Sequence, residues 1–206
     1  TSSEMRPNPR KTTSIRRLGP VDITALREAV LAIPETTWES ENATKPNRFG
    51  VLDATRHIVF RFVSDFKDWR KSYSGPLWGS WRSLVEPVLE QAVRPYGYAH
   101  GDYPRIMLAR MAAGGVIQPH RDSFPSAKWP HKIHVPLLTN DKVTFFIGGV
   151  GHHLAEGEAV EVSNMAVHSV ENAGDGDRIH LIFEYYDLDQ PPPEWLGSGD
   201  SLAARA

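Results

Sequence analysis

The sequence contains no cysteine among its 206 residues, which excludes disulfide bonds, thiolate metal ligands and cysteine nucleophiles. It has no apolar run of about 18 residues, the length that predicts a transmembrane helix, and no apolar signal-peptide core at its N-terminus. Charge of neither sign dominates, because 25 acidic residues oppose 23 Lys and Arg for a formal net charge of −2. We therefore expect a soluble, cytoplasmic protein with no electrostatic case for binding nucleic acid or a membrane.

The size and composition predict one domain with one sizeable core, because 40% of the residues are hydrophobic. Residues 1–18 are polar and basic, and we expect them to form a flexible arm. A single domain is expected over 19–190, with supporting helices and strands in 19–99 and a β-rich core in 100–187. Residues 191–206 begin with a run of prolines after a polar turn and are predicted to form a surface tail.

Hydrophobic periodicity predicts two helices followed by many short strands. The helices are expected over 22–32, ended by Pro34, and over 81–93, where apolar residues recur at helical spacing. Residues 57–63 alternate as a strand should, and turn residues separate the strands that follow. Short strands at regular spacing predict a mainly β fold, best described as a jelly-roll barrel with flanking helices. The later strands are expected at 106–111, 118–122, 133–138, 144–147, 159–162, 166–170 and 178–186.

The segment Gln118-Pro119-His120-Arg121-Asp122 contains a pair of metal ligands at His-x-Asp spacing. On an extended strand His120 and Asp122 would share one face, because strand side chains alternate with period two. With the distant His168 they form the set that holds non-haem Fe(II) and leaves coordination positions open. His-x-Asp alone is more often a structural or surface feature, so the prediction depends on the ordered set with His168 and Arg178.

Arg178 opens an apolar strand ten residues after His168. A buried arginine there would suit the distal carboxylate of 2-oxoglutarate, because an unpaired buried cation is costly until an anion binds. The residues thus predict an Fe(II)- and 2-oxoglutarate-dependent hydroxylase. The alternative of another class is a cupin-type metal-binding protein that does not use 2-oxoglutarate, and Arg178 is the residue that discriminates between the two.

Four motifs resemble the aspartyl/asparaginyl β-hydroxylase family, which includes microbial proline cis-hydroxylases. They are QPHRD at 118–122, HVPL at 134–137, HSVEN at 168–172 and RIHLIF at 178–183, and the likeness covers roughly residues 100 to 187. The resemblance implies a double-stranded β-helix fold, an Fe(II) cofactor, 2-oxoglutarate as cosubstrate and O2.

The resemblance also implies roles for individual residues. His120 and His168 correspond to iron ligands, and Arg178 to the partner of the 2-oxoglutarate C5 carboxylate. Lys132 and His134 occupy the positions of a basic-x-His pair that helps to hold the cosubstrate, although the family more often has Arg first. The lysine ammonium is a point charge on a flexible chain, whereas an arginine guanidinium can donate two parallel hydrogen bonds to one carboxylate.

Asp122 separates this sequence from the animal protein hydroxylase that names the family, which lacks the carboxylate ligand. Free-proline hydroxylases keep it, so the substrate can be a peptidyl Asp or Asn side chain or a free amino acid such as proline. We expect a carboxylate-bearing amino-acid unit, bound beside the loop 123–130 that follows the ligand strand. The alternative is that this loop only closes over 2-oxoglutarate and that the arginines are surface charges. The candidate substrate residues are Arg121, Phe124, Trp129, Arg48 and Arg61.

Overall fold

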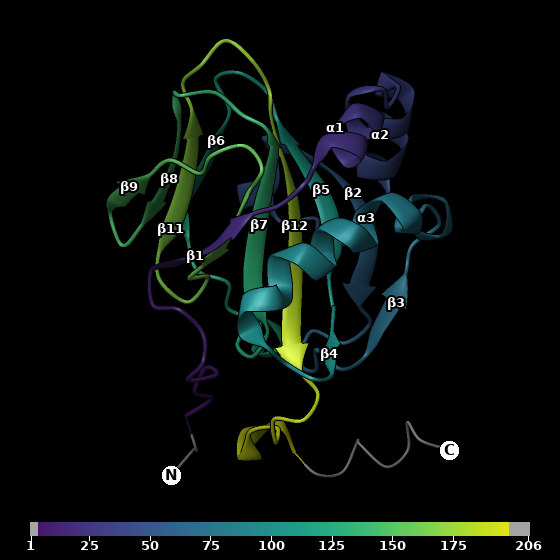
Figure 1. The fold of residues 1–206 in the computed structure, drawn as a ribbon. Coiled ribbons are helices and arrows are strands. Elements are labelled where there is room, and N and C mark those ends of the chain that lie inside the picture. Colours follow the sequence, from purple (N-terminus) through teal and green to yellow (C-terminus); the bar gives the residue numbers. More distant parts are fainter. Residues whose placement is uncertain (1–3, 198–206) are drawn as a thin grey trace.

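The structure, a computed structural model, describes residues 4–197 and consists mainly of two antiparallel β-sheets (Figure 1). The larger sheet has the strand order β1-β10-β7-β12-β5-β2-β3, with β4 paired to β12, and the smaller has the order β6-β11-β8-β9. Neighbouring strands are mostly not consecutive in the chain, as in the predicted jelly roll. The larger sheet contains β1 (Ile15–Pro20), β2 (Thr55–Val63), β3 (Ser72–Ser74), β4 (Gly101–Asp102), β5 (Ile106–Met111), β7 (His131–Leu138), β10 (Glu158–Val162) and β12 (Arg178–Asp187). The smaller sheet contains β6 (Val116–His120), β8 (Val143–Ile147), β9 (Val150–His152) and β11 (His168–Asn172).

Helices cover the larger sheet, and α3 lies across it (Figure 1). The buried side chains of α3 recur at helical spacing, so one stripe of the helix packs into the main hydrophobic core. The core also contains side chains from α1, α2, β2, β5, β7 and β12, so both halves of the chain share it. The helices are α1 (Thr24–Leu31), α2 (Glu35–Ala43) and α3 (Trp78–Val93), with 3-10 turns η1 (Gly50–Leu52), η2 (Arg94–Tyr96), η3 (Pro125–Ala127) and η4 (Glu194–Leu196).

The alternation of side chains along β12 positions the site. Ile179, Leu181 and Phe183 belong to the core beneath the helices. The side chains between them lie on the opposite face, where Arg178 and Glu184 line a cavity between the two sheets. Every residue of the strand except Asp187 is buried, because helices cover one face and the smaller sheet covers the other.

The prediction of a flexible arm is wrong for residues 8–18. Residues 15–20 form β1, which pairs with the outer edge of β10, and Asn8 and Lys11 are buried. The physical reason is that an open strand edge offers backbone hydrogen bonds that a polar, basic segment can satisfy as well as an apolar one. Residues 1–3 of the predicted arm lie outside the described residues.

Two further segments differ from expectation or extend it. The segment after the first helix contains α2, which is not one of the two predicted helices and in which only Trp38 is buried. The predicted tail packs against the body where Trp195 contacts Trp69, with ring centroids 5.9 Å apart, and residues 198–206 lie outside the described residues. Within residues 4–197, no helix combines the length and the hydrophobicity needed to cross a bilayer.

Candidate active site

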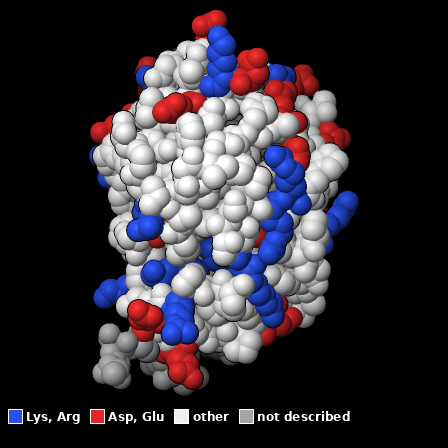
Figure 2. Space-filling view, turned by 90° about the vertical axis from the view of Figure 1, so that its left-hand side faces the viewer, with Lys and Arg blue, Asp and Glu red and all other residues white. Residues whose placement is uncertain are grey.

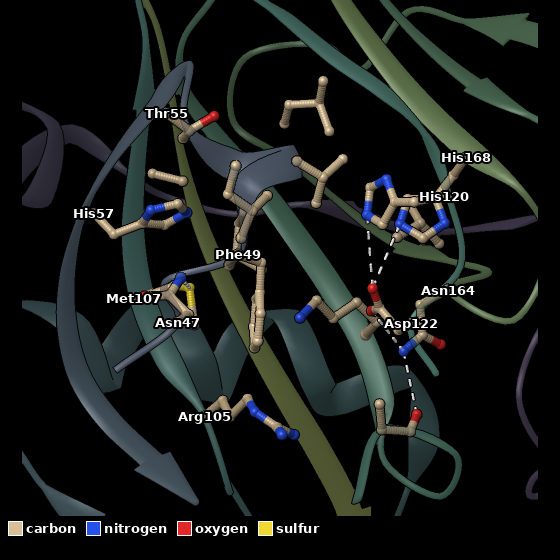
Figure 3. A pocket seen from close by; sticks show the side chains of 18 of the residues that line it. Asn47, Phe49, Thr55, His57, Arg105, Met107, His120, Asp122, Asn164 and His168 are labelled. Carbon is tan, nitrogen blue, oxygen red and sulfur yellow. Dashed lines mark hydrogen bonds and ion pairs between the residues drawn. The ribbon is translucent and has the colours of Figure 1, made fainter. Parts of the chain in front are cut away.

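Three side chains converge at the end of the smaller sheet (Figure 3). His120 on β6 and His168 on β11 are paired across the two strands, and their ring centroids are 4.2 Å apart. Asp122 Oδ1 lies 3.8 Å from Nε2 of His120 and 3.8 Å from Nε2 of His168. One potential ligand atom from each residue lies within 4.8 Å of the others, which suits a single metal ion. The strand ends at His120, two residues earlier than predicted, so Asp122 lies in the irregular segment that follows and is not oriented by strand alternation.

Backbone carbonyls fix the orientation of both imidazoles. The Nδ1–H of His120 donates to the Gln118 carbonyl at 2.8 Å, and the Nδ1–H of His168 donates to the Ala166 carbonyl at 3.0 Å. Each ring therefore directs the lone pair of Nε2 toward Asp122. Burial lowers the pKa of His168, which favours the neutral form that a metal requires.

Asn164 holds the carboxylate of Asp122. Its side-chain Nδ2 donates to Asp122 Oδ2 at 3.1 Å, and its backbone carbonyl accepts a hydrogen bond from the Asp122 backbone N–H at 3.1 Å. Burial alone would raise the pKa of Asp122, but nearby Lys132 and His168 and the Asn164 hydrogen bond hold that pKa below its ordinary value. The carboxylate is therefore ionised. Asn164 was not among the predicted site residues. The one feature of the sequence that could have indicated it is its position four residues before His168.

A cavity of about 370 Å³ is lined by His120, Asp122 and His168 and also by Arg178. Arg178 is buried, and its Nη2 donates to His180 Nδ1 at 3.0 Å. Its Nε and Nη1 are also buried and have no hydrogen-bond partner among the described residues. Burial lowers the pKa of Arg178 to about 10, so the guanidinium remains charged at neutral pH. A buried cation with two free donors fits a site for an anion.

Buried histidines surround this guanidinium. Because arginine can only donate, His180 Nδ1 must accept, and the Nδ1 of His134 therefore donates to it at 2.9 Å. Burial, followed by the charge of Arg178, holds the pKa of His134 and of His180 well below the ordinary value. His57 is also buried and lines the cavity, because β2 presents it on the inner face of the sheet.

A cluster of three charged residues, Lys132, Glu184 and Arg105, also lines the cavity. Lys132 Nζ lies 3.7 Å from Glu184 Oε2, and Arg105 Nη1 donates to Glu184 Oε1 at 2.7 Å. Arg105 also donates to Ser126 Oγ at 2.9 Å. The two cations are thus already partly neutralised, unlike Arg178. Sequence reasoning missed Arg105 and Glu184, although Glu184 lies six residues after Arg178 and so shares its face of the strand.

Two of the predicted substrate residues line the cavity, Arg121 and Phe124. Phe124 packs against Phe66 and Phe49, with ring centroids 4.5 and 5.5 Å away, and these two phenylalanines also line the cavity. Arg121 is exposed and has no hydrogen bond or ion pair with any residue of the described part of the chain.

The other three predicted substrate residues do not line this cavity. Trp129 is buried and stacks on Trp69, with centroids 5.7 Å apart. Arg61 donates to Ser72 and Ser74 hydroxyls and borders a different surface hollow. Arg48 is exposed outside the lining. Proximity to the ligand strand placed Trp129 near the site, but packing turns its ring toward the tail.

The side of the molecule that carries the smaller sheet is largely uncharged, and Lys and Arg side chains gather below and to the right of that uncharged area (Figure 2). Acidic side chains are interspersed along the same margin. The close view in Figure 3 shows the cavity itself, with the His-Asp-His group on one wall and His57, Thr55 and Arg105 on the others.

Comparison with known proteins identifies related sequences and folds. Residues 87–187 match the model of the family described as aspartyl/asparaginyl β-hydroxylase. The viral collagen prolyl hydroxylase of Paramecium bursaria Chlorella virus 1 has a similar fold, with 8% identity, a TM-score of 0.51 and coverage of 85% of this chain and 97% of that one. No curated protein sequence matches the chain.

Two other solved structures are similar at a lower level. A 2-oxoglutarate-Fe(II) oxygenase family oxidoreductase of Burkholderia pseudomallei shares 14% identity at a TM-score of 0.49, over 64% of this chain. The chain spans 66% of that protein's length, just under two thirds. A prolyl-4-hydroxylase of Pseudomonas putida shares 14% identity at a TM-score of 0.45, over 84% of this chain and 92% of that one.

Proposed function

Through residues 87–187 the chain belongs to the aspartyl/asparaginyl β-hydroxylase family, and from this premise we propose that it is an Fe(II)- and 2-oxoglutarate-dependent hydroxylase of an amino-acid side chain. The observation that carries the proposal is the presence, in one cavity, of an open three-ligand metal site and a buried arginine with two unpaired donors. The metal site alone would suit many proteins. The free Nε and Nη1 donors of Arg178 indicate, in addition, a binding position for an anionic group in the same cavity.

The residues present fit both groups. His120, Asp122 and His168 would hold Fe(II) through two imidazole nitrogens and a carboxylate oxygen, a set that leaves positions for 2-oxoglutarate and O2. Arg178 would bind the distal C5 carboxylate, and His180 orients its guanidinium. When bound, the metal and 2-oxoglutarate would activate O2, so that one oxygen atom enters a substrate C–H bond as a hydroxyl group and the other enters the succinate formed, with CO2, from 2-oxoglutarate.

Lys132 and His134 complete the proposed cosubstrate site from β7. Both line the cavity, and His134 belongs to the hydrogen-bonded group around Arg178. Lys132 Nζ already lies close to the Glu184 carboxylate, which partly neutralises its charge. Lys132 therefore contributes less to cosubstrate binding than Arg178 does. The apolar walls between the polar groups exclude water from the reacting atoms.

The proposed substrate is an amino-acid unit with at least one carboxylate, a peptidyl Asp or Asn side chain ahead of a free amino acid such as proline. Arg121 supports this choice, because it is a cavity-lining cation without a partner among the described residues. The cluster of Phe49, Phe66 and Phe124 offers an apolar wall beside it.

The substrate proposal is tested by turnover of a peptide library and of free amino acids. Arg121→Met should raise the KM of the best substrate about 10–150-fold, the value of one charge-assisted hydrogen bond. Arg61→Met is the matched control, because that arginine lies outside the cavity and is expected to leave the KM unchanged. Activity confined to substrates without a carboxylate, or equal KM values in both variants, would remove the carboxylate from the proposal.

The cupin alternative predicts a different response to ligand. A metal-binding cupin that does not use 2-oxoglutarate has no need for the unpaired donors of Arg178. If 2-oxoglutarate together with Fe(II) raises the melting temperature beyond the effect of Fe(II) alone, the hydroxylase proposal is supported. An identical melting temperature with and without 2-oxoglutarate would favour the cupin.

A further inference from the structure

The segment of residues 8–12, named here the N-terminal strap, is fastened to the loop that follows the metal ligands. The backbone N–H of Asn8 donates to the Lys128 carbonyl at 3.0 Å, and Asn8 Nδ2 donates to the Trp129 carbonyl at 3.1 Å. Lys11 enters deeper and is 8% exposed. The strap lies outside residues 87–187, the segment that matches the family model.

The ammonium group of Lys11 has three acceptors, one for each of its protons. Nζ donates to the Ala127 carbonyl at 2.9 Å, to the Pro130 carbonyl at 2.6 Å and to Asn164 Oδ1 at 2.7 Å. Burial lowers the pKa of Lys11 to about 8, so most molecules keep the charge at pH 7. Two of these contacts hold the loop, and the third reaches the residue that holds Asp122.

The contact with Asn164 determines which way its amide faces. Lysine can only donate, so Lys11 requires the carbonyl oxygen Oδ1 on its own side. The amide Nδ2 must then face the other way, where it donates to Asp122 Oδ2 at 3.1 Å and to the Ala127 carbonyl at 3.2 Å. A reversed amide would set a carbonyl oxygen against the carboxylate, which is repulsive.

We propose that Lys11 is a positioning residue for the metal site, acting through Asn164 to hold Asp122. With Oδ2 of Asp122 occupied by Asn164, Oδ1 is the oxygen left between the two imidazoles. The proposal rests on the proposed metal site. Outer partners of metal ligands contribute about 10–100-fold to metal affinity. Lys11 would therefore affect the metal affinity of the site although it lies 111 residues before Asp122 in the chain.

The test compares Lys11→Met with Asn8→Ala in the full chain. Both changes loosen the strap, but only the first removes the hydrogen bond to Asn164. Metal affinity is measured by anaerobic titration with Fe(II) and with Co(II), whose absorption reports the geometry of its ligands. Lys11→Met should weaken both metals about 10–100-fold. Asn8→Ala should lower the melting temperature while metal affinity stays at the wild-type value.

A double-mutant cycle with Asn164→Leu gives a second and independent comparison. Once Asn164 is gone, Lys11→Met should cause no further loss of metal affinity, although it should still lower the melting temperature. If Lys11→Met does not fold, Lys11→Gln takes its place, because it keeps a donor on a shorter side chain and should lose less affinity than Asn164→Leu.

Three outcomes overturn the inference. They are wild-type metal affinity in the Lys11 variants, an equal loss in Asn8→Ala, or wild-type affinity in Asn164→Leu. Failure of the wild-type chain to bind Fe(II) or Co(II) would overturn the proposed function as well, so the two failures are distinguishable.

Discussion

Replacement of Arg178 by methionine should have opposite effects on the free protein and on its binding of 2-oxoglutarate. In the free protein the guanidinium is buried with two unpaired donors, so the change removes a desolvated charge at the cost of one hydrogen bond to His180. We therefore expect the ligand-free variant to be at least as stable as the wild type. Methionine replaces the aliphatic stem of the arginine with a flexible apolar chain and introduces no new polar group.

The expected binding defect is at least that of losing one charge-assisted hydrogen bond between the Arg178 guanidinium and the C5 carboxylate. A hydrogen bond to a charged group contributes about 1.5–3 kcal/mol, or about 10–150-fold in affinity. At a 2-oxoglutarate concentration 100 times the wild-type Kd, ligand binding should stabilise the wild type by about 2.7 kcal/mol. A variant whose Kd is 100-fold higher should gain only about 0.4 kcal/mol under the same conditions.

The assay is chemical unfolding with Mn(II) in place of Fe(II), which avoids oxidation, with and without 2-oxoglutarate. Arg121→Met is the control, because it lines the same cavity but is exposed, and it should keep the full ligand response. The reasoning is refuted if Arg178→Met and the wild type are stabilised equally by 2-oxoglutarate. It is also refuted if the ligand-free variant loses several kcal/mol, which would make Arg178 a structural residue.

The remaining predictions concern the metal and pH. Alanine in place of His120, Asp122 or His168 should weaken Fe(II) binding by more than about 100-fold, the upper limit for loss of an outer partner, and abolish turnover, while circular dichroism stays unchanged; near-normal turnover in any variant would remove that residue from the ligand set. The buried histidines His57 and His134 should make the protein sensitive to acid. Their pKa values are held low in the folded state, mainly by burial, so below about pH 6.5 the unfolded chain takes up protons that the folded chain does not. The free energy of unfolding should then fall by up to about 1.4 kcal/mol per pH unit for each histidine, and His57→Gln should make that slope shallower by one histidine's share in urea unfolding from pH 7.5 to 5.5. A flat profile would contradict the assignment of neutral histidines.

The parts of the fold that could be predicted are those that depend on short-range periodicity. Strand β5 was expected at its observed bounds, and β12 to within one residue, because buried side chains alternate or run continuously between clear turns. Helix α2 was missed because it buries only Trp38 and so has no apolar stripe. Strand β1 was missed because its partner is β10, more than 140 residues later, and its own composition is that of a solvated segment.

In the site, too, the residues with a local sequence pattern could be predicted and those placed by long-range contacts could not. His120, Asp122, His168 and Arg178 are each recognisable from residue type and spacing, and the structure brings all four to one cavity. The outer partners Asn164 and Lys11 could not be predicted, because the contact from Asn164 to Asp122 spans 42 residues and the contact from Lys11 to Asn164 spans 153. Lys11 is the strongest example, since it was assigned to a flexible arm and lies instead beneath the metal site.

The most direct test of the central claim is calorimetric titration of 2-oxoglutarate into the anaerobic protein with and without Fe(II). We predict one binding site per chain and a higher affinity when the metal is present, because Arg178 and the metal would hold opposite ends of the same molecule. By reciprocity, Fe(II) should bind more tightly in the presence of 2-oxoglutarate by the same factor. An absence of binding, or an affinity for 2-oxoglutarate that is the same with and without Fe(II), would contradict the assignment of this cavity to a metal and its cosubstrate.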